Sequence, residues 1–300
     1  MAETGRRGAT TAPADRVPGT RSGLLDGRSI RELAEAAGLR PSKQRGQNFV
    51  TDPNTVRRIV ALSGVGPDDV VVEVGPGLGS LTLGLLEAGA QVVAVEVEPA
   101  LADRLVRTVA GRLPGAEARL RVLEADALRV TTLPGPAPTK VVANLPYNIS
   151  VPVLLHLAEM LPTWTSALVM VQLEVCDRLV AAPGSKVYGV PSAKLAWWAT
   201  ATRVGTVPPT VFWPVPNVDS GLVALTRRPP PDTTAPRERV FQVIDAAFGQ
   251  RRKMLRAALA PLVGSSAAAS EVLVAAGVDP TARGETLGIA DFARVAERLG

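Results

Sequence analysis

The sequence predicts a doubly wound α/β sheet domain followed by a smaller, all-helical domain. From Thr55 onward, short β-branched apolar runs alternate with helical stretches, and strands that are apolar on both faces are typical of a parallel sheet covered by helices. A proline-rich linker at 227–236 ends this alternation, and no strand pattern follows it. We therefore expect the sheet domain over residues 28–229 and the helical domain over residues 230–300.

The first residues of the chain have the composition of a disordered tail. Residues 1–27 are rich in Gly, Thr, Pro, Ala and Arg and contain almost no large apolar side chains, so burial cannot offset the entropy lost on ordering them. A helical spacing of apolar residues then predicts a short helix over 29–37, which Gly38 ends.

Six apolar runs have the pattern of strands, and four later segments have the pattern of helices. The strands are expected at 70–74, 92–97, 120–125, 140–145, 166–173 and 220–226. A hairpin-like excursion before the last run would make that strand antiparallel to its neighbours. The helices of the second domain are expected at 237–248, 250–262, 268–277 and 289–300.

The composition excludes several classes of protein. Cys176 is the only cysteine, which excludes an internal disulfide, and with His156 as the only histidine the chain lacks the cluster that a zinc or iron–sulfur site needs. The sequence has no run of eighteen apolar residues, and its N-terminus lacks the apolar segment of a secretion signal. We therefore expect a cytoplasmic protein without a metal and without a membrane partner.

The charge of the chain indicates a phosphate-bearing partner. The net charge of +5 comes mainly from arginine, whose forked donors suit phosphate oxygens. In the segment FGQRRKMLRAAL, the cations Arg251, Arg252, Lys253 and Arg256 follow one another without an intervening acid. A charge run is usually a solvated face, but a cluster of cations alone neutralises phosphates, so RNA contact is expected here.

Polar features follow three successive strands of the predicted sheet. Gly75, Gly77 and Gly79 lie at a strand-to-helix turn, where glycine lets the backbone approach a ligand. Glu96 ends the next strand, where a carboxylate can accept both hydroxyls of a ribose, and Asp126 follows the third strand. Features of this kind at one sheet edge predict a nucleotide-type cofactor, and both NAD and S-adenosylmethionine fit them.

An NAD-dependent oxidoreductase is therefore one alternative. Hydride transfer needs a general acid or base, most often a histidine, and the only histidine lies in the apolar helical run VPVLLHLAEM. This position suits a half-buried structural role for His156 better than a catalytic one, which argues against the oxidoreductase.

The fourth strand ends in NLPY, which suits chemistry on an adenine amine. The lone pair of that amine is delocalised into the ring, and acceptors around its hydrogens localise it. The side-chain oxygen of Asn144 and a backbone carbonyl held by the rigid Pro146 would be these acceptors. Tyr147 would stack on a base that has left its helix. The simpler interpretation, a capping turn with a core tyrosine, loses weight because this turn shares its edge with the three cofactor-type features.

With these motifs, the chain resembles the small-subunit rRNA adenine dimethyltransferases, called KsgA or RsmA in bacteria. The resemblance covers about residues 40–300 and rests on GQNFVTD, EVGPGLGSLT, Glu96, DAL, NLPYNIS, QLEVCDRLVAAPGSKVYG, FWPVPNVDS, FGQRRKMLRAAL and DPTARGETL. It implies a Rossmann-like methyltransferase sheet with a helical RNA-binding domain. It also implies dimethylation at N6 of two adjacent adenosines in the 3′-terminal hairpin of 16S rRNA, with S-adenosylmethionine as donor, during biogenesis of the 30S subunit.

The resemblance also assigns roles to residues at the matching motif positions. Asp126 would bind the adenine end of the cofactor, Glu96 its ribose, and Asn144 would face both cofactor and target amine. Tyr147 would hold one face of the flipped base and Phe212 the other. The full set expected at the S-adenosylmethionine site is Asn48, Val50, Gly75, Gly77, Glu96, Asp126 and Asn144.

Two departures from the family pattern concern the expected RNA face. The family often has an aromatic residue where this chain has Arg45, and a lysine where it has Asn217. Lys43 and Arg45 flank the expected cofactor entrance and would grip the RNA backbone around the flipped nucleotide. The departures bear on RNA contact rather than on the reaction.

Two further functions fit the same polar features at the sheet edge. A 23S rRNA adenine methyltransferase of the macrolide-resistance type has the same pocket and turn, but the QRRK and VDS segments suit the small-subunit enzyme better. A binding factor that monitors ribosome assembly, with incidental catalysis, is the second alternative, although the intact NLPY turn favours chemistry. A large substrate makes a monomer the expected form.

Overall fold

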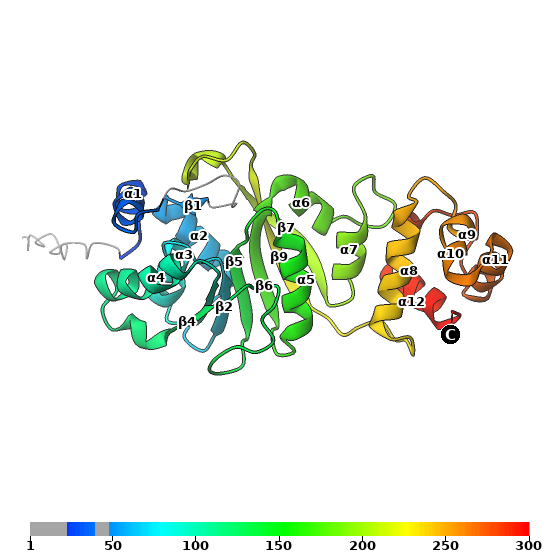
Figure 1. Cartoon of the computed structure of the whole chain (residues 1–300), viewed down its shortest axis with the longest axis horizontal. Helices are drawn as coiled ribbons and strands as arrows, with labels where there is room; N and C mark the ends of the chain where they lie inside the picture. Colours follow the sequence, from blue (N-terminus) through cyan, green and yellow to red (C-terminus); the bar gives the residue numbers. More distant parts are fainter. Residues whose placement is uncertain (1–22, 40–47, 300) are drawn as a thin grey trace, which may run out of the picture.

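The computed structural model describes residues 23–39 and 48–299 and has a seven-stranded sheet at its centre (Figure 1). The strand order is β4-β3-β2-β5-β6-β9-β7, in which β9 is antiparallel to β6, β7 is antiparallel to β9, and the other neighbours are parallel. The doubly wound α/β fold and the antiparallel strand after the excursion are thus confirmed. The strands are β2 (Val70–Val74), β3 (Gln91–Glu96), β4 (Leu120–Glu124), β5 (Lys140–Asn144), β6 (Ser166–Gln172), β7 (Ala199–Val207) and β9 (Ser220–Arg227).

The inner strands of the sheet are apolar on both faces because helices cover both. Val71 belongs to a buried cluster on one face, and its neighbour Val72 to a cluster on the other, as the alternation of side chains along a strand requires. The first face packs against α1 (Gly27–Ala36), α2 (Pro53–Ser63), α3 (Ser80–Glu87) and α4 (Pro99–Arg112), with η2 (Ala116–Arg119) beside them. The second packs against α5 (Ser150–Met160), α6 (Leu173–Leu179) and α7 (Val190–Leu195).

The strand β7 is the one that hydrophobic periodicity does not predict. It lies at the end of the sheet, where Thr200, Thr202, Arg203 and Thr206 are exposed. An edge strand with one covered side needs no continuous apolar run, so its sequence lacks the pattern of the buried strands.

The predicted C-terminal boundary of the disordered tail, residue 27, is wrong. Leu24 and Leu25 fall within the predicted tail of residues 1–27, yet they are 5% and 0% exposed and pack into the core with Ile30 of α1. Asp26 caps this helix by accepting the backbone N–H of Ser29 at 2.8 Å. Local composition did not show this because the two leucines gain their burial from α1 and the sheet.

A second, two-stranded sheet joins segments that are far apart in the sequence. The strand β1 (Phe49–Val50) pairs antiparallel with β8 (Phe212–Trp213), and η3 (Pro209–Val211) precedes β8. The Thr51 N–H donates to the Val211 carbonyl at 2.8 Å, which fixes the two segments together. Phe49 and Val50, at the end of the GQNFV motif, therefore lie beside the FWPVP motif.

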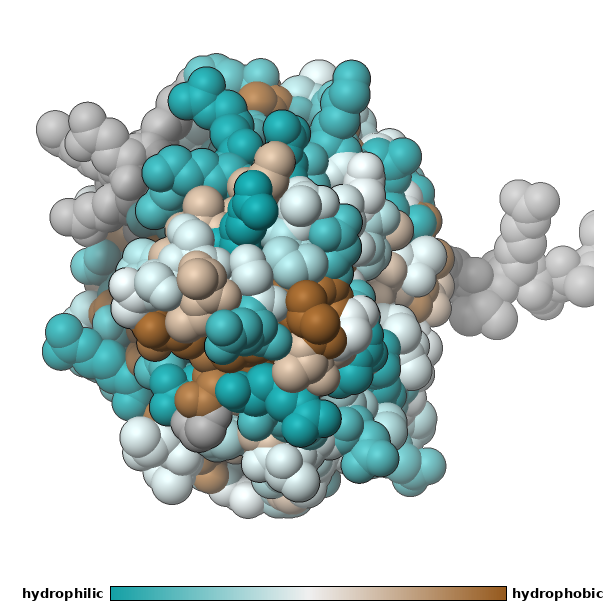
Figure 2. Space-filling view, turned by 90° about the vertical axis from the view of Figure 1, so that its right-hand side faces the viewer, coloured by the Kyte–Doolittle hydropathy of each residue, from teal (hydrophilic) through white to brown (hydrophobic). Residues whose placement is uncertain are grey.

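The described chain beyond β9 contains helices and no strand, as predicted, and it forms one end of the molecule (Figure 1). Most of the surface at this end is hydrophilic (Figure 2), and its exposed large apolar side chains include Leu262 and Val274. The core continues into these helices, because Phe241 packs edge-on against Trp198 with ring centroids 5.4 Å apart. The helices are α8 (Arg237–Gly249), α9 (Leu255–Ala258), α10 (Ala260–Val263), α11 (Ser266–Ala275), η4 (Gly284–Thr286) and α12 (Ile289–Glu297).

The prediction of one continuous helix over 250–262 is wrong. Residues 250–254 form a turn, and two short helices follow it. The first N–H groups of α9 are taken by a neighbouring segment, since Leu255 donates to the Ala282 carbonyl at 2.8 Å and Arg256 to the Pro280 carbonyl at 3.1 Å. These long-range bonds replace the helical bonds that the sequence pattern predicts.

No helix in the described residues is long and apolar enough to span a membrane. The same residues contain no group of three or more His, Cys, Asp or Glu side chains placed to hold a metal ion.

Candidate functional site

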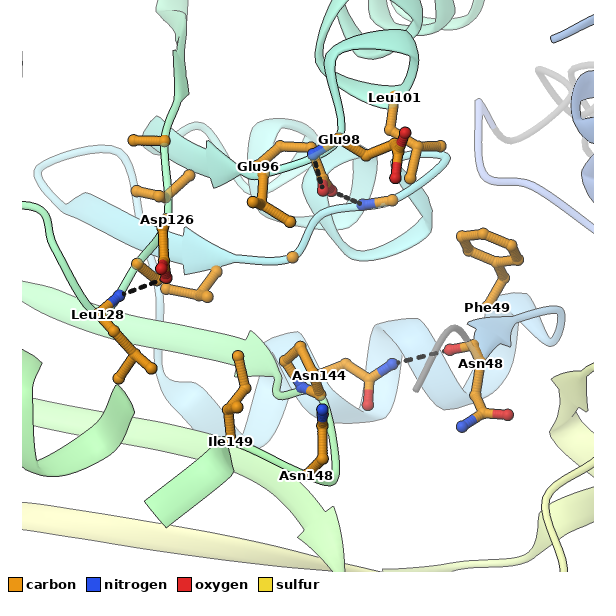
Figure 3. Close-up of a pocket in the computed structure, with 18 residues that line it drawn as sticks. Asn48, Phe49, Glu96, Glu98, Leu101, Asp126, Leu128, Asn144, Asn148 and Ile149 are labelled. Atoms are coloured by element: carbon orange, nitrogen blue, oxygen red, sulfur yellow. Dashed lines mark hydrogen bonds between the residues drawn. The ribbon is translucent and has the colours of Figure 1, made fainter. Parts of the chain in front are cut away.

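A cavity of about 490 Å³ lies where the carboxyl ends of four parallel strands meet (Figure 3). This volume is in the range of small-molecule sites, and the position is the one at which open α/β sheets bind ligands. Side chains from strand ends and from the segment before β1 point into the same space. The lining comprises Asn48, Phe49, Val74, Gly75, Gly77, Val95, Glu96, Val97, Glu98, Leu101, Ala125, Asp126, Ala127, Leu128, Asn144, Pro146, Asn148 and Ile149.

The glycine turn between β2 and α3 forms the floor of this cavity. Gly75 and Gly77 have φ values of +67° and +58°, which L side chains rarely adopt. A Cβ atom at Gly77 would lie 2.7 Å from the Phe49 ring, so there is no room for a side chain. The turn itself requires glycine at Gly77, and the predicted close approach of the backbone to a ligand stays a prediction.

Glu96 is held in a fixed orientation at the end of β3. Its carboxylate is 5% exposed and accepts the backbone N–H groups of Gly77 at 3.2 Å and Glu98 at 3.1 Å (Figure 3). Burial raises the pKa of Glu96, while these hydrogen bonds oppose that rise. A carboxylate oriented in this way keeps further lone pairs with which to accept hydroxyl groups of a ligand.

A second acid, Glu73, lies beneath the glycine turn without lining the cavity. It is 2% exposed and accepts a hydrogen bond from the Thr82 hydroxyl at 2.6 Å. Burial, aided by the charge of Glu96, raises the pKa of Glu73 to about 8. Glu73 is therefore mostly protonated at neutral pH and adds little negative charge beneath the turn.

Asp126 combines a structural role with the position predicted for a ligand contact. Its Oδ1 accepts the Leu128 N–H at 3.0 Å, and Arg129 lies 3.6 Å from its Oδ2. The side chain is 42% exposed and lines the cavity. Asp126 thus stabilises its own turn and lies at the cavity, and its contact with a ligand stays a prediction.

Asn144 has its amide orientation fixed by a distant segment. The side-chain nitrogen Nδ2 donates to the Asn48 backbone carbonyl at 3.0 Å (Figure 3). The amide oxygen then remains as the acceptor at the end of β5. Asn48 also contributes a buried side-chain oxygen that has no hydrogen-bond partner among the described residues, which suits a polar ligand group.

The ring of Tyr147 is held by its hydroxyl. This residue is half-buried, and its hydroxyl lies 2.8 Å from the Ser220 hydroxyl at the start of β9. Burial raises the pKa of the Tyr147 phenol, so the hydroxyl is neutral and can share a hydrogen bond with the serine. Pro146 and Asn148, its two neighbours in the chain, both line the cavity, which places Tyr147 beside it.

Comparison with known proteins shows the family of the chain. Residues 39–300 match the family model described as ribosomal RNA adenine dimethylase. The chain belongs to this family. It is therefore an S-adenosylmethionine-dependent rRNA adenine methyltransferase, which excludes the oxidoreductase alternative.

Relatives of this dimethylase agree with the assignment. The chain is 65% identical to ribosomal RNA small subunit methyltransferase A of Cutibacterium acnes, over 93% of its own length and 95% of the relative's. It is 63% identical to the protein of the same name from Thermobifida fusca, over 91% and 96% of the two chains. These relatives span nearly the whole chain, so the likeness includes the C-terminal helices.

Two solved structures resemble the dimethylase in fold. A dimethyladenosine transferase from Plasmodium falciparum gives a TM-score of 0.69 at 22% identity, covering 82% of this chain and 95% of the other. The 23S rRNA methyltransferase ErmE gives a TM-score of 0.61 at 28% identity, covering 84% and 99%. The Rossmann-like sheet is thus confirmed.

The cavity of the dimethylase fits its cofactor. The glycine turn leaves room for a ligand against the backbone, and the oriented Glu96 carboxylate suits the two hydroxyls of a ribose. Leu101, Leu128 and Ile149 supply apolar lining. The sequence predicted the edge of the sheet at which they lie but did not predict these three residues. Phe49 was also missed, although it lies inside the GQNF motif that carried the resemblance.

Two residues predicted for the site are not at the cavity in the dimethylase. Val50 is 3% exposed and Phe212 is 2% exposed, and both side chains lie in the core beneath the β1–β8 pair. Val50 acts through its carbonyl, which accepts the Ser80 hydroxyl at 2.6 Å. The motif gave the correct segments, but strand pairing turned these two side chains inward. A role of Phe212 at the target base is therefore not supported by its place in the fold.

The predicted RNA-contact residues differ in their surroundings. Arg251 pairs with Glu285 at 2.9 Å and donates to the Lys186 carbonyl at 2.7 Å, so it links two loops. Arg252, Lys253 and Arg256 are exposed, and the charge of Arg256 helps to lower the pKa of Asp279. Lys43 and Arg45 lie outside the described residues.

Proposed function

We propose that this dimethylase transfers methyl groups to N6 of two adjacent adenosines in the 3′-terminal hairpin of 16S rRNA during assembly of the 30S subunit. The observation that carries the proposal is the hydrogen bond from Asn144 to the Asn48 carbonyl at the cavity edge, because it presents an amide oxygen where a base amine would enter. The names of the relatives, which specify the small subunit, support the choice of rRNA.

Asn144 prepares the target amine. Its amide oxygen accepts a hydrogen of the N6 amine, which draws the nitrogen lone pair out of conjugation with the adenine ring. The neutral amine is the nucleophile, so no general base has to deprotonate it before transfer. Alignment of the amine with the methyl donor supplies much of the acceleration. The bond to Asn48 prevents the amide from rotating and presenting its N–H₂ group instead.

The cofactor-binding residues keep the reactive groups aligned. Glu96 would hold the ribose and Asp126 the adenine end, with Asn48, Gly75 and Gly77 along the remaining wall. S-adenosylmethionine, when bound, supplies an electrophilic methyl group on a sulfonium. Residues on strand ends are rigid supports, so the donor is held at a constant place relative to Asn144.

The RNA is proposed to contact the exposed cations of the C-terminal region. Arg252, Lys253 and Arg256 can neutralise backbone phosphates, and Lys43 and Arg45 are proposed to act near the cavity entrance. Recognition by a cationic surface suits an RNA hairpin, whose deep groove is hard to read directly. The helical region is thus proposed as the RNA-binding domain, and the chain acts as a monomer.

Methyl transfer to immature small subunits tests the proposal. Purified protein with labelled S-adenosylmethionine should yield dimethyladenosine on nucleoside analysis. Asn144→Ala should abolish transfer even at saturating S-adenosylmethionine, a condition that compensates for any loss of cofactor affinity at this lining residue. Retention of wild-type turnover by the variant would contradict the mechanism.

The 23S alternative has a separate test. Primer extension on cellular rRNA should show methylation-dependent stops in 16S rRNA that vanish when the gene is deleted. Stops confined to 23S rRNA would refute the small-subunit assignment. The 65% identity to the C. acnes small-subunit protein supports that assignment more strongly than the 28% identity to ErmE supports the 23S alternative.

An assembly role is tested by complementation. If the inactive Asn144→Ala variant rescues the growth defect of a deletion strain, binding during assembly is the main contribution of the protein. If only the wild-type protein rescues the growth defect, methylation is the main contribution of the protein.

A further inference from the structure

The hydroxyl of Ser220 is a buried polar group that the reaction described above does not use. Ser220 is 0% exposed and begins β9, where Gln172 of β6 and Val207 of β7 pair with it on either side. Neighbouring strands on both sides fix its backbone. Within the described residues, the side-chain partner of its hydroxyl is the Tyr147 hydroxyl at 2.8 Å.

Tyr147 lies on the short connection between β5 and α5. This connection is held at its base, because the Ile149 N–H donates to the Pro146 carbonyl at 3.2 Å. The far end of the half-buried ring is held by Ser220. The ring is therefore fixed at its backbone by the turn and at its hydroxyl by the sheet.

We propose that Ser220 is a positioning residue for methyl transfer, which holds the Tyr147 ring in the plane on which the target adenine stacks. This inference rests on the proposed function. It assigns a role to the VDS segment, since Ser220 places a hydroxyl from the antiparallel strand beside the loop that follows β5. A stacking platform is useful only when its plane is fixed, because a tilted ring displaces the amine from the methyl donor.

The hydroxyl pair can be tested by a double-mutant cycle. Ser220→Ala and Tyr147→Phe each remove one partner and retain the rest of the side chain. Each should lower kcat for small-subunit methylation by about fivefold to tenfold, the effect of one neutral hydrogen bond. The double variant should be no slower than Tyr147→Phe alone, because Ser220 acts through the phenol.

The affinity for S-adenosylmethionine, measured by calorimetry, should stay unchanged in all three variants, which also shows that they are folded. Ser192→Ala is a matched control, because it removes a buried serine hydroxyl that bonds to the Arg178 carbonyl and does not line the cavity. This control should keep wild-type kcat.

Two results would overturn the inference: wild-type kcat in Ser220→Ala, or losses that multiply in the double variant. If Ser220 had only a structural role, Ser220→Ala would lower the melting temperature of the protein, and the effects of the two single substitutions on kcat would be additive in free energy. A wild-type protein that methylates no small-subunit rRNA would instead refute the proposed function, so the two failures are distinguishable.

Discussion

Substitution of the buried Glu73 should change how the stability of the protein depends on pH. Burial raises the pKa of this carboxyl from 4.5 to about 8, so the folded state keeps a proton that the unfolded chain releases above about pH 4.5. The unfolded state thus binds fewer protons between these values, and the free energy of unfolding falls as the pH rises from 5 to 8. Its slope approaches about 1.4 kcal/mol per pH unit, which amounts to roughly 3 kcal/mol over that window.

Glu73→Gln should remove this contribution. Glutamine has the same shape, stays neutral and can still accept the Thr82 hydroxyl, so any fixed cost of the substitution is independent of pH. Denaturant unfolding of both proteins from pH 5 to pH 9 gives the difference in unfolding free energy. This difference should move in favour of Gln by roughly 3 kcal/mol between pH 5 and pH 8 and then level off.

The substitution of the exposed Glu87 by Gln, on the same helix as Thr82, gives the baseline for a change from Glu to Gln. If the wild-type and Glu73→Gln curves run parallel over the whole pH range, Glu73 is ionised in the folded state and the argument is wrong.

Three further predictions follow from particular contacts. Gly77→Ala should weaken S-adenosylmethionine binding at least tenfold in calorimetry, because φ is +58° and the new Cβ would lie 2.7 Å from the Phe49 ring. The control Gly111→Ala, at an open helical position, should bind S-adenosylmethionine normally. Arg252→Ala should weaken RNA binding and lower the salt slope by about 1, whereas Arg251→Ala should mainly lower the free energy of unfolding by about 1 kcal/mol, since its partly exposed ion pair joins two loops. Leu25→Ala should destabilise the protein by about 2–5 kcal/mol in denaturant unfolding, and a neutral result would mean that this segment does not belong to the core.

The elements that the sequence predicted well are those with a strong local pattern. The strands β2, β3, β5, β6 and β9, which lie inside the sheet, are apolar on both faces, and this pattern is visible in the sequence. The edge strand β7 has exposed threonines and no such run. The predicted helix at 250–262 failed for the opposite reason, since its pattern was helical but carbonyls from residues 280 and 282 took the N–H groups.

The sequence by itself determined the fold class and the edge of the sheet that binds the cofactor. Gly75, Glu96, Asp126 and Asn144 each follow a strand, and parallel strands bring their carboxyl ends to one edge, so chain order alone places these residues together.

Only the tertiary structure decided how the side chains are oriented at that edge. Pairing of β1 with β8 turned Val50 and Phe212 into the core, the Asn48 carbonyl fixed the Asn144 amide, and Ser220 reached Tyr147 across the sheet. These contacts join residues that are between 73 and 164 positions apart, whereas hydrophobic period and motif spacing describe only neighbours in the chain. The orientation of an amide or a ring is set by long-range packing, which no local pattern records.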